Sequence, residues 1–322
     1  IGSIIKGTSF EGHVFAVGGS VRDFYMGNDI KDIDLVIDLP NGGVDFANWC
    51  KDQGYTKTVV VYATYGTAMF MFKQFPGEEI ECVMTRGEKY EDKESRNPVT
   101  VFADINEDAI RRDLTINALY YNVSTGEILD LVSGQEDINN HIIRTTNQDP
   151  DIVFDDDPLR ILRVIRFATR YGWEIESKTY KSMKKYAKRL KIITKERIQA
   201  EFNKILMSEN AVMGINMLHD IGAMTFIVPE FEKCYGLTQN RFHFGDVAEH
   251  TLAVLDYHCK HFDADLTERL ACFLHDIGKI MTRSVKDGKV HFYDHEYVGA
   301  EMAGDILREL KYDNDTIKKV QF

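Results

Sequence analysis

The spacing of hydrophobic residues changes along the chain, and the first part has the spacing of an α/β domain. Short apolar or β-branched runs of strand length occur at residues 13–17, 33–37, 58–62, 67–72 and 79–84. The third and fourth runs lie close together, which predicts a hairpin-like pair of strands. Helix-like stretches separate the other runs. We therefore expect an α/β domain over residues 1–125.

Beyond this domain the apolar residues follow the period of an α-helix. Between residues 157 and 206 the helical spacing is carried first by Ile161, Val164, Ile165 and Ala168. Helical patterns continue to the end of the chain, while the signals typical of strands fade. We expect two further domains, both all-α, over residues 126–235 and 236–322.

The composition is that of a folded globular protein rather than a disordered or membrane-spanning one. Of the 322 residues, 44% are hydrophobic and 28% are charged, and no apolar run approaches the ~18 residues of a membrane span. No signal peptide is visible, and the five cysteines form no CxxC pair, which indicates reduced thiols and a cytoplasmic location. The net charge of −12, taken by itself, argues against a nucleic-acid partner.

Two adjacent glycines, Gly18 and Gly19, follow the first predicted strand and open a short helix that contains Arg22. Glycine lets the backbone approach a ligand closely, and the free N–H groups at a helix start can bind phosphate. A purely structural turn is the commoner explanation of such a pair. Both explanations stay open for this motif on its own.

Two carboxylates, Asp32 and Asp34, are spaced i, i+2 in a predicted strand. This spacing puts both side chains on one face of the strand, roughly 6.5–7 Å apart. Because two carboxylates so placed repel each other, the pair suits divalent cations, and two Mg²⁺ ions held in this way can carry out phosphoryl transfer. An exposed pair at a strand edge is the alternative, and it is common for an isolated Asp-x-Asp sequence.

A third acid would complete such a metal site. Glu79 and Glu81 share one face of the strand predicted at residues 79–84, although Glu79 is equally explained as a solvated residue. Further on, residues 111–117 are interpreted as a charged turn that enters a helix. The structural alternative for these residues is an ordinary N-terminal cap.

The helix predicted after Asp157 and Pro158 carries a stripe of arginines. Pro at the first helical position and Asp as the N-cap make a favourable start. At 100° per residue, an arc of about 120° opposite the apolar face contains Arg160, Arg163, Arg166 and Arg170. On an isolated helix, a solvated basic face is the commoner meaning of such a stripe.

Four motifs occur in a fixed order, namely GGSVRD, DID, RRDLTINAL and DDPLRILRVIRFA. They lie in residues 10–205, and together they resemble the class II tRNA nucleotidyltransferases and bacterial poly(A) polymerases. The resemblance implies an α/β nucleotidyltransferase head, built from a mixed sheet with helices, followed by an all-α neck and an all-α body. It also implies transfer of nucleotides to the 3′ end of an RNA.

The resemblance assigns roles to residues of the head. Asp32 and Asp34 would be the metal ligands of a two-Mg²⁺ active site, with Glu81 as the third acid. The remaining positions would bind the nucleotide, the phosphates by Gly19, Arg22 and Arg112 and the ribose hydroxyls by Asp113 and Asn117.

In the neck, the resemblance makes Asp157 and Arg160 a pair that reads the base, with Arg163 and Arg166 also lining the nucleotide pocket. Cytosine and adenine present an amino donor beside a ring acceptor, whereas uracil and guanine reverse that order. An acceptor on Asp157 beside a donor on Arg160 therefore selects C and A. The family often has Glu-Asp before this helix, while residues 155–157 are all Asp here, a change that we expect to affect only the cap.

The C-terminal domain contains a set of histidines. His250 lies in a helical pattern, His275 and Asp276 begin 25 residues later, and His295 follows. Imidazoles with a carboxylate suit a divalent transition metal, Mg²⁺ or Mn²⁺. The pattern resembles the HD phosphohydrolases, specifically the HD unit fused to many bacterial CCA-adding enzymes. By this resemblance the four residues are candidate metal ligands.

The last Asp of the HD signature would lie beyond Phe322. Because the chain has no initiator Met and stops within a helical pattern, we expect it to be a trimmed part of a longer protein. A neighbouring cluster of aromatic and histidine side chains at residues 257–261 lacks suitable partners for a metal. We interpret that cluster as ordinary surface.

We therefore expect an enzyme that adds C, C and A from CTP and ATP to the 3′ end of tRNA. A long polar loop at residues 87–98 favours this over CC-only addition, because CC-only enzymes of the family lack an equivalent segment. The HD unit favours it over A-only addition and poly(A) synthesis, which stay open. Further alternatives are a metal phosphohydrolase with an RNA-binding head and a tRNA chaperone without catalysis. The oligomeric state is left open.

The distribution of charge reverses the first impression from the net charge. Between Arg160 and Ile205 there are 14 Lys and Arg residues against four acidic ones. Such a concentrated basic segment is typical of a surface that binds an RNA backbone. Part of the acidity elsewhere lies in the metal-binding sets, which a bound cation would partly neutralise.

Overall fold

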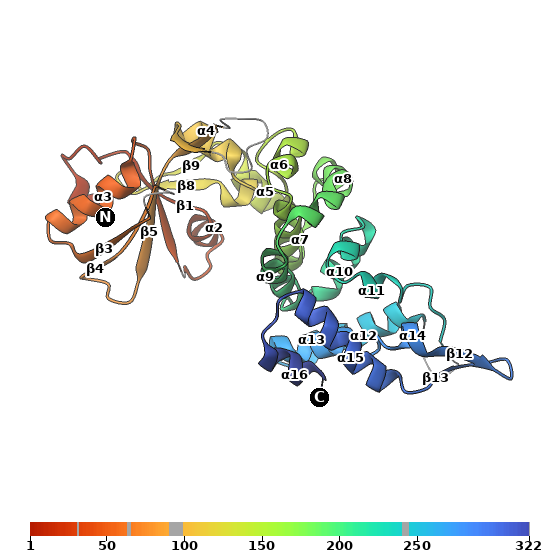
Figure 1. Cartoon of the computed structure of the whole chain (residues 1–322). Helices are drawn as coiled ribbons and strands as arrows, with labels where there is room; N and C mark the ends of the chain where they lie inside the picture. Colours follow the sequence, from red (N-terminus) through yellow and green to blue (C-terminus); the bar gives the residue numbers. More distant parts are fainter. Residues whose placement is uncertain (31, 63–65, 90–98, 240–244, 322) are drawn as a thin grey trace. The chain divides into compact units, whose positions relative to one another are not determined.

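The structure is a computed structural model that describes the whole chain except residues 31, 63–65, 90–98, 240–244 and 322 (Figure 1). The chain forms two compact units, residues 1–148 and 149–322. Among the described residues, α/β structure makes up the first unit and helices dominate the second, which confirms the expected fold class. The structure has two compact units, and the expected division into three domains at residues 125 and 235 stays a prediction.

A seven-stranded mixed sheet forms the centre of the first unit. Its strands run in the order β3-β4-β5-β2-β1-β8-β9, and neighbours are antiparallel except β2 and β5, which are parallel. The bounds are β1 Val14–Val17, β2 Ile33–Ile37, β3 Thr56–Tyr62, β4 Thr67–Phe72, β5 Glu79–Met84, β8 Leu119–Asn122 and β9 Ile128–Asp130. All five predicted strands are present, and β3 and β4 form the expected pair.

Alternating side chains give this sheet a core on each face. On one face Leu35 and Ile37 pack with residues of α3, while on the other Val36 packs with Val17 and Tyr120. Asp34 precedes Val36 by two residues and therefore lies on the second face. The other elements of this unit are α1 Gly2–Ile5, α2 Gly19–Tyr25, α3 Gly42–Asp52, β6 Arg86–Lys89, β7 Val99–Phe102, α4 Ile105–Arg111, α5 Gly134–Asn140 and β10 Ile142–Ile143.

The second unit is built mainly from helices, and none of those formed by described residues has the length and apolar character needed to cross a bilayer. The elements are α6 Pro150–Asp156, α7 Leu159–Tyr171, β11 Glu174–Ile175, α8 Ser177–Tyr186, α9 Lys195–Leu206, α10 Ala211–Asp220, α11 Pro229–Glu232, α12 Val247–His261, α13 Leu266–Leu274, α14 Lys279–Thr282, β12 Arg283–Lys286, β13 Lys289–Phe292, α15 His295–Glu309 and α16 Asn314–Gln321. Helix α7 buries its predicted apolar face against α9 and α10.

The prediction for residues 111–117 is wrong. Arg111 ends α4 instead of preceding a helix, Arg112 has an extended backbone, and a single 3₁₀ turn follows at Thr115–Asn117. The reason lies upstream, where the side chain of Asp104 accepts hydrogen bonds from two backbone N–H groups and so starts the helix earlier. The polar loop predicted at residues 87–98 lies mostly outside the described residues and stays untested.

Candidate active site and histidine cluster

The parallel pairing of β2 with β5 brings two predicted acids to the same level of the sheet. Asp34 is the register partner of Glu81, and both side chains are exposed. Asp32, also exposed, lies two residues before Asp34. Partial desolvation raises the pKa of Asp34, and the charge of Asp32 adds to this rise, while Arg112 opposes it. The acids therefore share a site at which a cation would be stabilised.

Arg22 on α2 is only 3% exposed and connects several predicted nucleotide-binding residues. Its Nε and Nη2 donate to the carboxylate of Asp23 at 2.9 and 3.0 Å, and its Nη1 donates to Oδ1 of Asn117. Asn117 in turn donates to Oδ1 of Asp113 at 3.4 Å. The structure thus brings Arg22, Asp113 and Asn117 into one buried network. A contact of Arg22 with phosphate stays a prediction.

The turn before α2 depends on glycine. Gly18 has φ of +77°, in the left-handed region that residues with a side chain rarely adopt. Gly19 begins α2, and a Cβ at this position would come within 3.4 Å of Nη2 of Arg22. The structural explanation of the glycine pair therefore holds, and it is compatible with binding of a ligand.

Arg112 is held in place by two side chains that sequence reasoning missed. Its Nε donates to Oδ2 of Asp108 at 3.0 Å and to the hydroxyl of Tyr120 at 2.9 Å, and Tyr120 donates to Asp108 at 2.7 Å. Burial raises the pKa of Tyr120, so its hydroxyl stays protonated and donates. The i, i+4 spacing of Asp108, on α4, and Arg112, the residue that follows this helix, was a usable signal for this pair.

In the second unit, the carboxylate of Asp157 lies at the start of α7. Its Oδ1 accepts from the backbone N–H of Leu159 at 3.1 Å, and its Oδ2 accepts from Nη2 of Arg197 at 2.8 Å. Pro158 has helical dihedral angles, but α7 begins one residue later than predicted, at Leu159. Arg197 lies 40 residues from Asp157, so no local spacing could have revealed this partner.

The predicted arginine stripe on α7 is partly buried. Arg160, Arg163 and Arg166 are half-buried, and Arg170 is exposed. Nη1 of Arg160 reaches the carbonyl of Val153 on α6 at 3.5 Å, and Nη1 of Arg166 donates to Glu201 on α9 at 3.0 Å. The stripe is therefore not the fully solvated face that an isolated helix would suggest. Both contacts lie within the second unit, and the roles of the arginines toward a nucleotide stay predictions.

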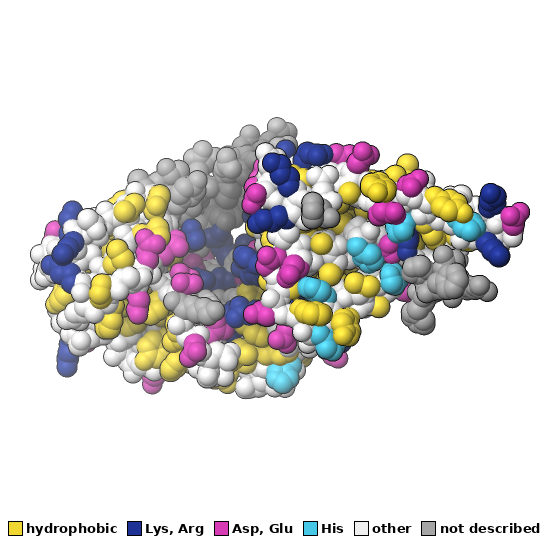
Figure 2. Space-filling view, turned by 90° about the horizontal axis from the view of Figure 1, so that it is seen from below, with side chains coloured by type: hydrophobic (Ala, Val, Ile, Leu, Met, Phe, Trp, Pro, Cys, Tyr) yellow, Lys and Arg dark blue, Asp and Glu magenta, His cyan; other side chains and the backbone are white. Residues whose placement is uncertain are grey.

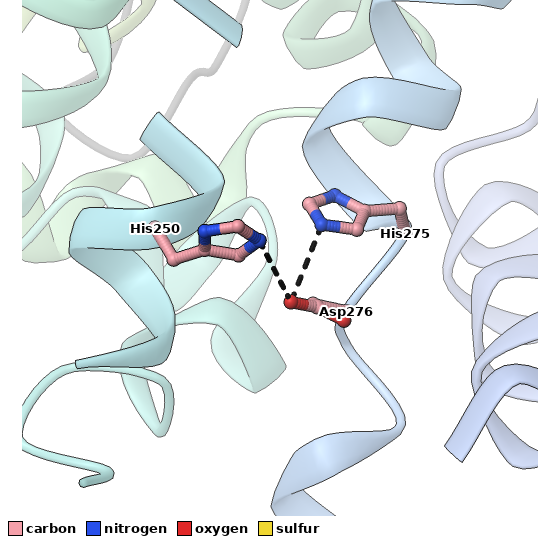
Figure 3. A group of neighbouring side chains, drawn as sticks. All are labelled: His250, His275 and Asp276. Carbon is pink, nitrogen blue, oxygen red and sulfur yellow. Dashed lines mark ion pairs between the residues drawn. The ribbon is translucent and has the colours of Figure 1, made fainter. Parts of the chain in front are cut away.

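The predicted histidine set converges on one carboxylate (Figure 3). Nε2 of His250 on α12 lies 3.5 Å from Oδ2 of Asp276, and Nε2 of His275 at the end of α13 lies 3.2 Å from the same oxygen. The ligand atoms of these three residues all lie within 4.8 Å of one another. Nε2 of His295 lies 3.6 Å from the other oxygen of Asp276. Three of the four predicted ligands therefore form one group, and His295 lies beside it at the other oxygen of Asp276.

Backbone carbonyls orient two of these imidazoles for metal binding. Nδ1 of His275 lies 2.8 Å from the carbonyl oxygen of Cys272, and Nδ1 of His295 lies 2.8 Å from that of Phe292. Because a carbonyl oxygen only accepts, each Nδ1 donates, which leaves Nε2 as the atom that would bind a metal. This set of donors fits a divalent transition metal, for which imidazole is a preferred ligand.

A buried lysine shares the carboxylate of Asp276. Nζ of Lys279, which is 2% exposed, donates to Oδ2 of Asp276 and to Oε1 of Gln239, each at 2.7 Å. Burial by itself would raise the pKa of Asp276, but hydrogen bonds from His275 and Lys279 outweigh burial and hold this pKa well below its usual range. The carboxylate therefore stays ionised. Sequence reasoning missed Lys279.

Three known families cover most of the chain. The Poly A polymerase head domain matches residues 14–144, and the probable RNA and SrmB-binding site of polymerase A matches residues 172–235. The HD domain matches residues 247–321, which include His250, His275, Asp276 and His295. The families follow the order that the motifs predict.

The multifunctional CCA protein of Pseudomonas paraeruginosa is 32% identical over 309 residues, which are 94% of this chain and 71% of that protein. The chain belongs to the family of the multifunctional CCA proteins. Another member, from Pseudomonas savastanoi pv. phaseolicola, is 34% identical over 281 residues, which are 84% of this chain and 64% of that protein. Membership of the CCA protein family confirms the resemblance seen in the motifs and the nucleotidyltransferase class of this enzyme.

Solved structures of CCA-adding enzymes have the same fold. The Bacillus stearothermophilus enzyme in complex with CTP has a TM-score of 0.67 and 23% identity, and the match covers 95% of this chain and 63% of that one. A tRNA nucleotidyltransferase with a primer tRNA and an incoming ATP analog has a TM-score of 0.62 and 24% identity, over 81% and 72% of the two chains. These likenesses support the head and helical body described above.

Proposed function

We propose that this chain adds C, C and A in that order to the 3′ end of tRNA, with CTP and ATP as substrates and pyrophosphate as the product. Membership of the CCA protein family supports this activity. The observation in the structure that carries the proposal is the pairing of Asp34 with Glu81, close to Asp32 and Arg112. The activity is therefore placed in the head.

Nucleotidyltransferase heads and HD domains both use divalent metals, and we propose Mg²⁺ for the head. Asp32 and Asp34 would hold the ions, with Glu81 as the third acid. When bound, Mg²⁺ would lower the pKa of the primer 3′-hydroxyl and stabilise the charge that develops on the phosphates. The exposure of all three acids leaves them accessible to the ions and to substrate.

The other head residues would bind and orient the nucleotide. The hydrogen bonds of Arg112 with Asp108 and Tyr120 fix its guanidinium, so that it can hold the triphosphate without losing much side-chain freedom on binding. Asn117 and Asp113 would orient the ribose hydroxyls, and their bonds within the buried network hold both side chains in position.

The neck would select the base. Asp157 offers an acceptor and Arg160 a donor, which match the edges of cytosine and adenine and mismatch those of uracil and guanine. Arg163 and Arg166 would line the same nucleotide pocket. Because the carboxylate of Asp157 accepts from Arg197 in the structure, Arg197 would also keep this acceptor oriented.

The test offers three tRNA substrates, ending before CCA, after C and after CC, each with CTP, ATP, UTP or GTP and Mg²⁺. The proposal expects C, C and A to be added in order, after which addition stops. Long A tails or a failure to incorporate C would overturn it in favour of a poly(A) polymerase or an A-adding enzyme. A complete lack of pyrophosphate release would favour a tRNA-binding protein without catalysis.

The histidine cluster supports a second activity, a metal-dependent phosphohydrolase in the HD unit. The observation that favours it is the convergence of His250, His275 and His295 on the ionised Asp276. The test measures binding of Ni²⁺, Co²⁺ or Mn²⁺ by calorimetry and hydrolysis of an aryl phosphodiester. His250→Ala with His275→Ala should abolish hydrolysis and remove the metal that the HD unit binds, while Asp34→Asn should leave hydrolysis unchanged. Hydrolysis that survives the double substitution would rule out this site.

A further inference from the structure

A two-stranded hairpin extends from the helices of the second unit between α14 and α15 (Figure 1). Strands β12 and β13 pair antiparallel, and every residue of β12 is exposed. Asp287 and Gly288 connect them with φ values of +53° and +73°, the combination of a type I′ turn. This turn fixes the register and sets Lys286 directly opposite Lys289.

The facing lysines are unfavourable for the hairpin itself. Like charges directly opposite each other on an antiparallel pair destabilise it, and both lysines are exposed at the tip. Figure 2 shows Lys and Arg side chains, with an acidic side chain among them, at the far right end of this face, the end at which Figure 1 has β12 and β13. An anion between the two ammonium groups would replace their repulsion by attraction.

The face that carries the lysines continues into an exposed aromatic ring. Because register partners share a face and side chains alternate along a strand, Lys286, Lys289 and His291 lie on one face. Two residues further, the ring of Tyr293 stacks on His291 with centroids 5.0 Å apart and an interplanar angle of 7°. Tyr293 is 62% exposed, which leaves a flat ring surface open just past the end of β13, roughly 13 Å along the strand from Lys289.

Phe292 and its neighbours attach the hairpin to the histidine cluster. The ring of Phe292 lies 5.4 Å from Nζ of Lys279, the lysine that donates to Asp276. The carbonyl of Phe292 accepts from Nδ1 of His295. A strand bound along the hairpin would therefore lie beside the candidate metal ligands.

We propose that the β12–β13 hairpin binds a single-stranded end of RNA beside the histidine cluster, with Lys286 and Lys289 on phosphates and Tyr293 stacked on a base. Exposed aromatic rings beside cations are the usual composition of sites for single-stranded nucleic acid, because every base offers a flat face and every phosphate a charge. The inference rests on the proposed function in taking RNA as the partner. It does not depend on catalysis by either site.

The test uses the full chain without added nucleotides and a short labelled single-stranded RNA, followed by fluorescence anisotropy at several salt concentrations. Lys286→Ser with Lys289→Ser should make the slope of log affinity against log salt less negative by about 1.4, because each phosphate contact on a single strand contributes about 0.7. Tyr293→Ala should weaken binding by about 5- to 150-fold, and Tyr293→Trp should restore it. Lys318→Ser with Lys319→Ser on α16 removes the same charge from exposed positions and should leave binding unchanged.

The outcomes separate this inference from the proposed function. Failure of the unaltered chain to bind RNA would overturn both. RNA binding that is insensitive to the hairpin substitutions, or sensitive to the lysines but not to Tyr293→Ala, would overturn the hairpin site alone. Since the altered side chains are exposed, circular dichroism should show an unchanged fold. As a second measurement, RNA should quench the added indole in Tyr293→Trp, and an unquenched indole would contradict stacking.

Discussion

Asp34 and Arg22 lie in the same head but differ in whether the charge of the side chain is available to a ligand. Asp34 is exposed, and its pKa is raised because partial desolvation and the charge of Asp32 outweigh Arg112. A carboxylate in this situation gains from a cation placed beside it. Arg22 is buried, and Asp23 already neutralises its charge. Metal binding by Asp34 stays a proposal, whereas the structure shows Arg22 holding the side chain of Asn117.

Asp34→Asn tests the metal site. It should lower incorporation of CTP by about 10³-fold or more, because a metal ligand of this kind supplies several kcal/mol to the transition state. Stability should be unchanged or slightly higher near neutral pH, since a raised pKa means that the folded state disfavours the charged form. Single-turnover kinetics and urea unfolding check both expectations. Glu79→Gln on the same face of β5 as Glu81 is the matched control, and equal losses in the two variants would refute the assignment.

Asn117→Ala tests the buried network. The substitution removes the acceptor of Nη1 of Arg22, and it should lower the free energy of unfolding by about 1–3 kcal/mol. Asn117→Asp keeps an acceptor at this position and should retain more of the stability. Urea denaturation measures both, with Asn106→Ala at an exposed position of α4 as the control. A stability like that of the unaltered chain would show that the bond to Asn117 contributes nothing.

At the scale of elements, the sequence predicts helices and strands that depend on the local spacing of apolar residues. It misses contacts between residues that are far apart in the chain. Strands β1 to β5 and the buried face of α7 follow from the spacing of apolar residues within a few positions, whereas β8 and β9 of the same sheet were not predicted. The pairing of Asp34 with Glu81 depends on which strands become neighbours, and only the resemblance suggested it. The contact of Asp157 with Arg197 joins two helices and leaves no local pattern. The prediction missed the start of α4, because the N-cap at Asp104 begins a helix before the charged residues 111–117.

Helix α7 offers a paired test of base selection. Arg160→Ala should reduce the preference for CTP over UTP by about 5- to 150-fold, since a good donor and acceptor pair with a base gives about 1–3 kcal/mol of discrimination. Arg170→Ala removes the same charge from an exposed position on the same helix and should leave the preference unchanged. The ratio of kcat/KM for the two nucleotides measures the effect. An unchanged ratio in Arg160→Ala would refute the base-reading role.

At the scale of the whole molecule, the net charge argues against binding of RNA, whereas the local charge favours it. The chain carries a net charge of −12, yet residues 160–205 hold 14 Lys and Arg against four acids. An RNA responds to the local concentration of positive charge, because contacts beyond a Debye length of about 8 Å are screened in physiological salt. The basic segment, which begins on α7 and includes α8 and most of α9, is therefore the part of the second unit that we expect to attract tRNA.

The affinity for tRNA should accordingly fall steeply as salt rises. Lys181→Ser with Lys184→Ser on α8 should make the slope of log affinity against log salt less negative by about 0.7–0.9 for each lysine that contacts a phosphate. Both lysines are exposed, so the fold should be unaffected. Filter binding over a range of KCl concentrations measures the slope. A slope equal to that of the unaltered chain would place the phosphate contacts elsewhere.

The parallel pairing of β2 with β5 has a consequence for the order of folding. Parallel neighbours cannot be joined by a tight turn, and here α3, β3 and β4 lie between the two strands in sequence. The hydrogen bond from Thr85 to Asp38, 47 residues apart, closes the same long loop. Contacts across such a loop form late, because the entropy of closing it is lost before the contacts are gained. During synthesis Asp34 therefore stays without Glu81 until β5 has been made and has paired with β2.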